Sequence, residues 1–185
     1  MKIRKYLFVI PVITVMVLPA CNNEQVENAI NKSIDSLTIP EISAAIRQDP
    51  ENAVLFAKRG ELYMREMKAD SAMSDFDLAR RLDSLTADYH IKLSEACLLA
   101  KQSEKAKDAL MRCVRILPQN ADAITKLASI YFYAGDYKTA QKYLDEALQA
   151  DPQHANQYFV RGMLLLESGD TAKAVGSFQK TTEYD

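Results

Sequence analysis

From residue 53 onward, apolar and small residues recur every three or four positions along the chain. Phe56, Gly60 and Tyr63 share one stripe of a helix, and Ala72 and Phe76 share a stripe of the helix that would follow it. Polar residues fill most of the positions between them. The spacing predicts pairs of amphipathic helices, each of which buries one face.

Turn signals separate the predicted helices at regular intervals. Ala134-Gly135-Asp136 and Ser168-Gly169-Asp170 divide two of the pairs, with glycine as the left-handed residue that ends the first helix. Prolines that end second helices stand in Asp49-Pro50, Leu117-Pro118 and Asp151-Pro152, 68 and then 34 residues apart. A period of 34 residues is typical of a helix-turn-helix repeat. It divides the chain into units 53–86, 87–120, 121–154 and 155–185.

Superposing the four units shows which places recur. The eighth place is always small, and the twentieth is always alanine: Gly60, Ser94, Ala128 and Gly162, then Ala72, Ala106, Ala140 and Ala174. Small side chains allow two antiparallel helices to approach closely. We therefore expect Gly60 to face Ala72, and Gly162 to face Ala174.

These columns resemble the tetratricopeptide repeat family over residues 53–185. Arg59 and Arg161 depart from its pattern, which has leucine at that place. The resemblance implies an all-α fold, a right-handed superhelical solenoid of about four antiparallel hairpins. A degenerate half repeat at 38–52 would cover the first unit, because Thr38-Ile39-Pro40-Glu41 reads as a capping box that opens a helix.

The first 20 residues predict a signal peptide. Lys2, Arg4 and Lys5 precede an apolar stretch, 6–18, which is short for a membrane span and ends just before Cys21. Leu18 and Ala20 before Cys21 resemble a bacterial lipoprotein cleavage box, although Pro19 departs from it. We expect export, lipidation of Cys21 and a polar tether at 21–37; a transmembrane anchor or a plain secretory signal are the alternatives. Asn22 and Asn23 favour an outer-membrane address facing the periplasm.

Charge and composition exclude several functions. Removing residues 1–20 lowers the basic residues from 23 to 20 against 25 acidic ones, so the mature protein is a poor ligand for nucleic acid. His90 and His154 have no partner at metal-ligand spacing, and no nucleophile lies near a base, so we expect no enzyme, metal or cofactor. Cys97 and Cys113 lie on one seam at opposite ends of a hairpin, which predicts two buried free thiols rather than a disulfide.

In the family, partners bind in a concave groove lined by the first helices. The lysine and asparagine pattern with which some relatives hold a peptide carboxylate is absent here. The groove places instead carry aromatic, methionine and acidic residues, suited to an extended or helical peptide with apolar anchors, with or without basic charge. Packing between neighbouring first helices is the alternative role for these side chains. The expected groove residues are Met64, Arg65, Glu95, Leu98, Ser129, Phe132, Tyr133, Phe159, Met163 and Glu167.

Two functions fit this sequence. The first is a membrane-tethered scaffold or adaptor that binds a protein or peptide in the cell envelope. The second is a lipoprotein that assembles with itself through its last hairpin and organises an envelope complex, because the sequence ends at Asp185, before any helix that would cover Val175 and Tyr184. A truncated sequence is the alternative explanation for that uncovered hairpin.

Overall fold

The computed structural model describes residues 36–184. The predicted signal peptide, Cys21 and nearly all of the predicted tether lie outside the described residues. Within the described part, no helix is long and apolar enough to cross a membrane.

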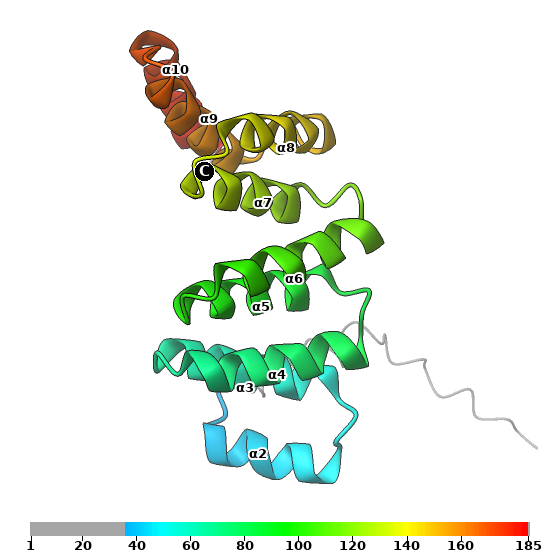
Figure 1. The fold of residues 1–185 in the computed structure, drawn as a ribbon. Coiled ribbons are helices and arrows are strands. Elements are labelled where there is room, and N and C mark those ends of the chain that lie inside the picture. The colour runs from blue at the N-terminus through cyan, green and yellow to red at the C-terminus, as the bar shows by residue number, and fades with distance from the viewer. Residues whose placement is uncertain (1–35, 185) are drawn as a thin grey trace, which may run out of the picture. The chain divides into compact units, whose positions relative to one another are not determined.

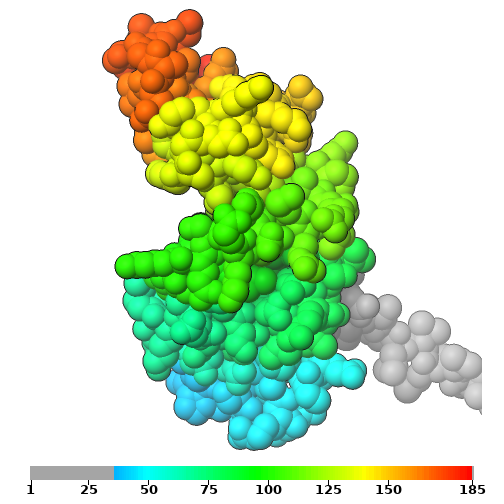
Figure 2. Space-filling model, in the orientation of Figure 1, coloured from blue at the N-terminus to red at the C-terminus, as the bar shows by residue number. Residues whose placement is uncertain are grey.

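The described residues form helices and no strands, which confirms the all-α helical repeat fold. Four hairpins follow a single helix, and the first helices of the hairpins begin at alanines 34 residues apart. Figure 1 shows them stacked in chain order, and the colours of Figure 2 follow the same order along the surface. The helices are α2 (Ile39–Gln48), α3 (Ala53–Arg65), α4 (Ala69–Leu82), α5 (Ala87–Leu99), α6 (Ser103–Ile116), α7 (Ala121–Tyr133), α8 (Tyr137–Ala150), α9 (Ala155–Glu167) and α10 (Thr171–Tyr184).

The single helix α2 begins with the predicted capping box. The backbone N–H of Thr38 donates to Glu41 Oε2 at 2.8 Å, and the hydrogen bonds from Thr38 lower the pKa of the Glu41 carboxyl. Ile42 and Ile46 are buried on the face that this helix turns to its neighbours. Capping and burial together account for a ten-residue helix that would be marginal in isolation.

Every turn within a hairpin uses one residue of left-handed backbone. Gly135 and Gly169 have φ of 78° and 83°, which confirms their predicted place in the turns. Met67 and Lys101 occupy the same place in the first two hairpins with φ of 59° and 60°. A side chain is strained there, so these two turns are less favourable than their glycine counterparts.

The small residues of the seam make room for aromatic rings. The alanines at the twentieth place are completely buried. The side chain nearest to Gly60, however, is that of Phe76. A Cβ on Gly60 would lie 2.8 Å from Cε1 of Phe76, and a Cβ on Gly162 would overlap the ring of Phe178 in the same way. The nearest neighbour of each glycine is therefore an aromatic ring and not the expected alanine. Each glycine accommodates a ring one turn further along the second helix.

The first hairpin holds a buried ion pair. Arg59 Nε and Nη2 donate to the two carboxylate oxygens of Asp75, each at 2.7 Å, and Arg59 Nη1 donates to Ser43 Oγ of α2 at 3.0 Å. The Asp75 side chain is only 4% exposed. The hydrogen bond to Asp75 raises the pKa of the Arg59 guanidinium above its ordinary value and outweighs the desolvation that opposes it. The arginine that departs from the repeat pattern thus connects α2, α3 and α4.

Candidate partner-binding groove

A groove of about 460 Å³ crosses the first helices of the last three hairpins. Side chains of α5, α7 and α9 line most of it, and α6 contributes one edge. Both polar and apolar side chains line it, and they include Glu95, Leu98, Asp122, Thr125, Lys126, Ser129, Tyr133, Asn156 and Phe159.

Three large apolar side chains in this groove face solvent. Leu98 from α5 is 44% exposed, Tyr133 from α7 is 75% exposed, and Phe159 from α9 is 44% exposed. Neighbouring rings support the two aromatic side chains: Tyr133 lies edge-on to Phe132, with ring centroids 5.3 Å apart, and Phe159 lies 5.9 Å from Phe178. Exposed aromatic side chains held by packing are suitable anchors for a partner, because they lose little conformational entropy on binding. We refer to Leu98, Tyr133 and Phe159 as the apolar triad.

The structure brings some of the expected groove residues together and separates others. Glu95, Leu98, Ser129, Tyr133 and Phe159 line the groove. Met64 and Arg65 instead line a smaller hollow of about 350 Å³ between α3 and α5, which Glu95 also borders.

Three further expected residues lie outside both hollows. Phe132 is only 8% exposed, because Val160 and Leu164 of α9 pack in the same cluster. Its expected exposure in the groove is wrong. Met163 is half-buried against this cluster, and the exposed Glu167 accepts a hydrogen bond from Tyr137 Oη at 3.1 Å.

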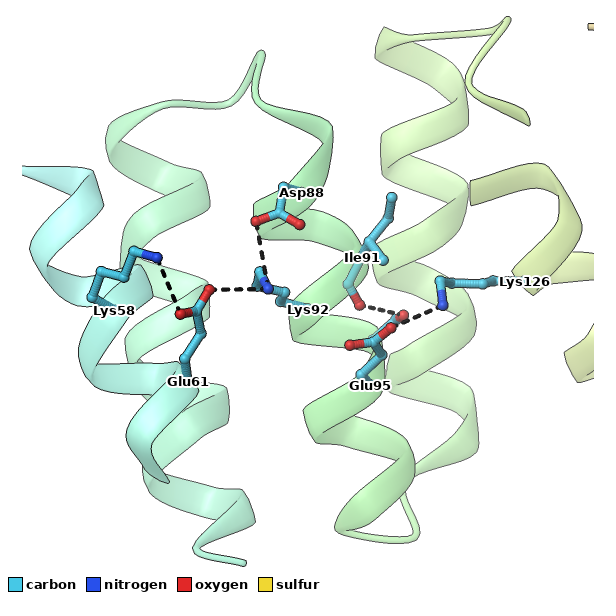
Figure 3. Close-up of polar contacts among 8 residues, drawn as sticks. Lys58, Glu61, Asp88, Ile91, Lys92, Glu95 and Lys126 are labelled. Carbon is cyan, nitrogen blue, oxygen red and sulfur yellow. Dashed lines mark hydrogen bonds and ion pairs between the residues drawn. The ribbon is translucent and has the colours of Figure 1, made fainter. Parts of the chain in front are cut away.

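Ion pairs connect neighbouring first helices. Lys92 of α5 lies 3.0 Å from Glu61 of α3, and Lys126 of α7 lies 2.8 Å from Glu95 of α5. Figure 3 shows this row of charges passing from helix to helix. Desolvation lowers the pKa of Lys92, but the hydrogen bond to Glu61 and the surrounding carboxylates outweigh it, so the pKa is raised. Carboxylates therefore dominate the electrostatic surroundings of this lysine.

The sequence contained a signal for these ion pairs that our prediction missed. Lysine stands at the sixth place of the first three units, as Lys58, Lys92 and Lys126.

Three of the four residues considered for chemistry lie in the core, and His154 is half-buried at the start of α9. His90 is 1% exposed, and its Nε2 lies 3.1 Å from the carbonyl oxygen of Ser84, so it is a core histidine. Cys97 and Cys113 are buried free thiols, as predicted, and burial raises the pKa of Cys113 to about 11. Residues 36–184 contain no cluster of three or more His, Cys, Asp or Glu side chains that could hold a metal ion.

The last helix, α10, exposes few large apolar side chains. Val175 is 52% exposed and Tyr184 is 37% exposed, but the ring of Tyr184 packs 5.2 Å from that of Tyr158 in the same hairpin. Most other exposed residues of α10 are polar or small. This surface is less apolar than the groove.

Comparison with known families supports the repeat inferred from the sequence. Residues 125–184 match the family model described as Tetratricopeptide repeat. The match covers the last two hairpins, from within α7 to the end of α10.

One sequence relative and two solved structures illustrate what this chain is similar to. The human mitochondrial import receptor subunit TOM70 is 25% identical over 166 residues, which are 85% of this chain but only 26% of that protein. The crystal structure of MamA superposes with a TM-score of 0.68 at 23% identity, covering 85% of this chain and 92% of MamA. That of YrrB, a TPR protein with an unusual peptide-binding site, superposes with a TM-score of 0.60 at 18% identity, covering 89% and 82% of the two chains. At these identities the structural likeness establishes the fold alone.

Proposed function

We propose that this protein is a scaffold or adaptor that binds a polypeptide partner in the groove across α5, α7 and α9. The observation that carries the proposal is the apolar triad, in which three successive first helices each expose one large side chain to the same groove. Burying such side chains against a partner supplies about 25 cal/mol for each Å² removed from water. We propose binding rather than catalysis, because His90, Cys97 and Cys113 of the described core are buried away from this groove.

The similar proteins are consistent with this role. TOM70 is an import receptor subunit, and YrrB has a peptide-binding site. Both descriptions concern recognition of other molecules. This chain spans only about a quarter of TOM70, so the partners of TOM70 cannot be transferred to it. The chemistry of its partner has to be inferred from the residues that line the groove of this chain.

We also propose that the scaffold is exported and held at a membrane by lipid on Cys21, with the outer membrane as its expected location. The support is the basic start, the apolar stretch and the cysteine that follows it. Acyl chains on Cys21 would anchor the protein firmly, because each buried CH₂ group contributes about 0.8 kcal/mol. Labelling cells with a palmitate analogue tests this: wild type should carry the label in the membrane fraction, and Cys21→Ser should carry none. Equal labelling of the two proteins would refute the anchor.

Crosslinking and capture from membranes test the adaptor. We compare wild type with Tyr133→Ala/Phe159→Ala, which removes two side chains of the triad. The matched control is Met67→Ala/Leu85→Ala, which removes side chains exposed to 69% and 70% elsewhere on the molecule. A partner recovered with wild type and the control, but lost with the triad variant, would support the groove. Recovery of the same partners with all three proteins would refute it.

Self-assembly through α10 is the second candidate, and the exposure of Val175 is the observation that favours it. Mass measured over a range of protein concentrations distinguishes the two functions. An oligomer that dissociates on Val175→Lys would support self-assembly, whereas a monomer at all concentrations would exclude it.

A further inference from the structure

The ion pairs between first helices follow a rule that fails at the last junction. The ninth place of one unit pairs with the sixth place of the next: Glu61 with Lys92, and Glu95 with Lys126. At the third junction these places hold Ser129 and Val160, and Val160 is 5% exposed. The row of charges in Figure 3 therefore ends at α7. The α9 residues that line the groove, Asn156, Phe159 and Val160, are uncharged.

The carboxylates outnumber the ammonium groups where the row ends. At the first junction, two lysines, Lys58 and Lys92, lie within 3.8 Å of two carboxylates, Glu61 and Asp88. At the second junction, Lys126 is the one described lysine with an ion pair to Glu95 and Asp122, at 2.8 and 3.9 Å. Lys92, one turn before Glu95 on α5, forms its ion pairs with Glu61 and Asp88 instead.

The only other charged side chains that line the groove neutralise each other. Glu104 and Lys107 form an ion pair at its edge. The charged side chains that line the groove are thus three carboxylates and two ammonium groups, which gives a net charge of −1. The unbalanced negative charge lies beside the apolar triad.

We infer that the groove accepts a peptide segment with an apolar anchor and an adjacent lysine or arginine. This rests on the proposed binding function and states the chemistry of its partner. The apolar anchor would cover Leu98, Tyr133 and Phe159, and the cation would take the second ammonium position beside Glu95 and Asp122. The site is partly shielded from water, so a correctly placed cation is favoured over an anion, which would be repelled.

The first junction is a poor site for the same partner. Glu61 already interacts with two ammonium groups, at 3.3 and 3.0 Å. A bound cation would have to displace one of them, and the exchange gains little. The geometry therefore directs the partner to the end of the groove formed by α5, α7 and α9.

The test is a selection of random dodecapeptides displayed on phage against the purified full chain. Peptides that bind should be enriched in an aromatic or aliphatic residue next to lysine or arginine. The affinity of one selected peptide is then measured by fluorescence anisotropy, together with that of a copy in which glutamate replaces its basic residues. The charge-reversed copy should bind at least tenfold more weakly at low salt, and the difference should shrink as salt is added.

Paired variants identify the carboxylates responsible. Glu95→Gln/Asp122→Asn leaves Lys126 without its acidic neighbours, and the basic peptide should lose about tenfold in affinity. The matched control, Glu61→Gln/Asp88→Asn, makes the same change one junction earlier and should leave the affinity within about twofold. Equal losses in the two variants would overturn the inference.

The outcomes separate this inference from the proposed function. If wild type selects acidic or uncharged peptides that no longer bind Tyr133→Ala/Phe159→Ala, the charge preference is wrong and the groove stands. If no peptide is enriched, or if the selected peptides bind the triad variant equally well, the groove and the inference both fail.

Discussion

The buried ion pair of the first hairpin predicts a pattern of stabilities that the repeat itself allows us to test. Arg59 and Asp75 stand at the seventh and twenty-third places of their unit. The second unit has Leu93 and Ala109 at the same places, and both are buried there. Replacing Arg59 by leucine and Asp75 by alanine therefore gives the first unit the same two residues that the second unit already buries at these places.

The single substitutions should cost much more than the double substitution. Arg59→Leu removes both 2.7 Å hydrogen bonds and leaves the carboxylate of Asp75 buried without its cation. Removing one partner of a buried ion pair costs about 3–5 kcal/mol, and we expect about 3 because the Arg59 side chain is 19% exposed. Asp75→Ala should cost less, about 1–3 kcal/mol, since the guanidinium can turn toward water. The double variant should lie within about 1 kcal/mol of wild type.

Equilibrium unfolding in urea, followed by far-UV circular dichroism, measures these differences. The four proteins form a double-mutant cycle, and the coupling energy should be about 3 kcal/mol or more. The slope of the unfolding free energy against urea should stay constant, which shows that the unfolded states are comparable. A double variant as unstable as Arg59→Leu would refute the reasoning, because the loss would then come from packing and not from an unpaired charge.

Three further predictions concern the turns, the seam and the thiols. Met67→Gly should stabilise the protein by about 1 kcal/mol in urea unfolding, because the left-handed φ of 59° at this position suits glycine. Gly135→Ala should destabilise it by a similar amount for the same reason. Changes of the same sign in the free energy of unfolding of both variants would contradict this. Gly60→Ala should destabilise the protein by about 1–3 kcal/mol, because the added methyl group overlaps the buried ring of Phe76. Gly176→Ala, whose methyl group meets no atom within 4 Å, should stabilise its helix by up to about 1 kcal/mol. A midpoint of thermal unfolding that shifts in the same direction for both variants would be inconsistent with this. Cys113 should be alkylated by iodoacetamide far more slowly in the folded protein than in urea, because it is fully buried and its pKa is about 11; mass spectrometry of its peptide gives both rates, and equal rates would refute the burial.

The helices and their order could be predicted because they depend on local signals. Helical spacing, the 34-residue period and the glycine turns all lie within short stretches of sequence. The left-handed turns at Met67 and Lys101 escaped prediction, because neither residue type favours that backbone. Position in the repeat overrides local preference there.

Contacts between helices were harder to predict than the helices themselves. A small residue shows that something approaches closely, but not which side chain does so. Gly60 was assigned to Ala72, whereas the ring of Phe76, one turn further along, fills the space. The alanines of the twentieth place suggested the contact because they are the same in every unit. The nearest contact is instead made by the twenty-fourth place, which is aromatic in the first and last units only.

Exposure on the concave face was the least predictable feature. Leu98 and Phe132 stand at the same place of successive units, yet the exposed fraction is 44% for the first and 8% for the second. The difference comes from the helix that follows in each case. Val160 and Leu164 of α9 pack over Phe132, and this arrangement belongs to one junction and not to the repeat.

A single departure from the repeat therefore explains the form of the groove. Where Lys92 and Lys126 form ion pairs with the preceding helix, the last unit has Val160. An apolar side chain at that place packs in one cluster with Phe132, which accounts for the burial of Phe132. Because neighbouring residues of a helix point about 100° apart, burying Val160 turns Phe159 toward the groove. Valine at position 160 thus accounts for three features at once: the missing ion pair, the burial of Phe132 and the exposure of Phe159. The apolar anchor of the partner should therefore bind at this junction.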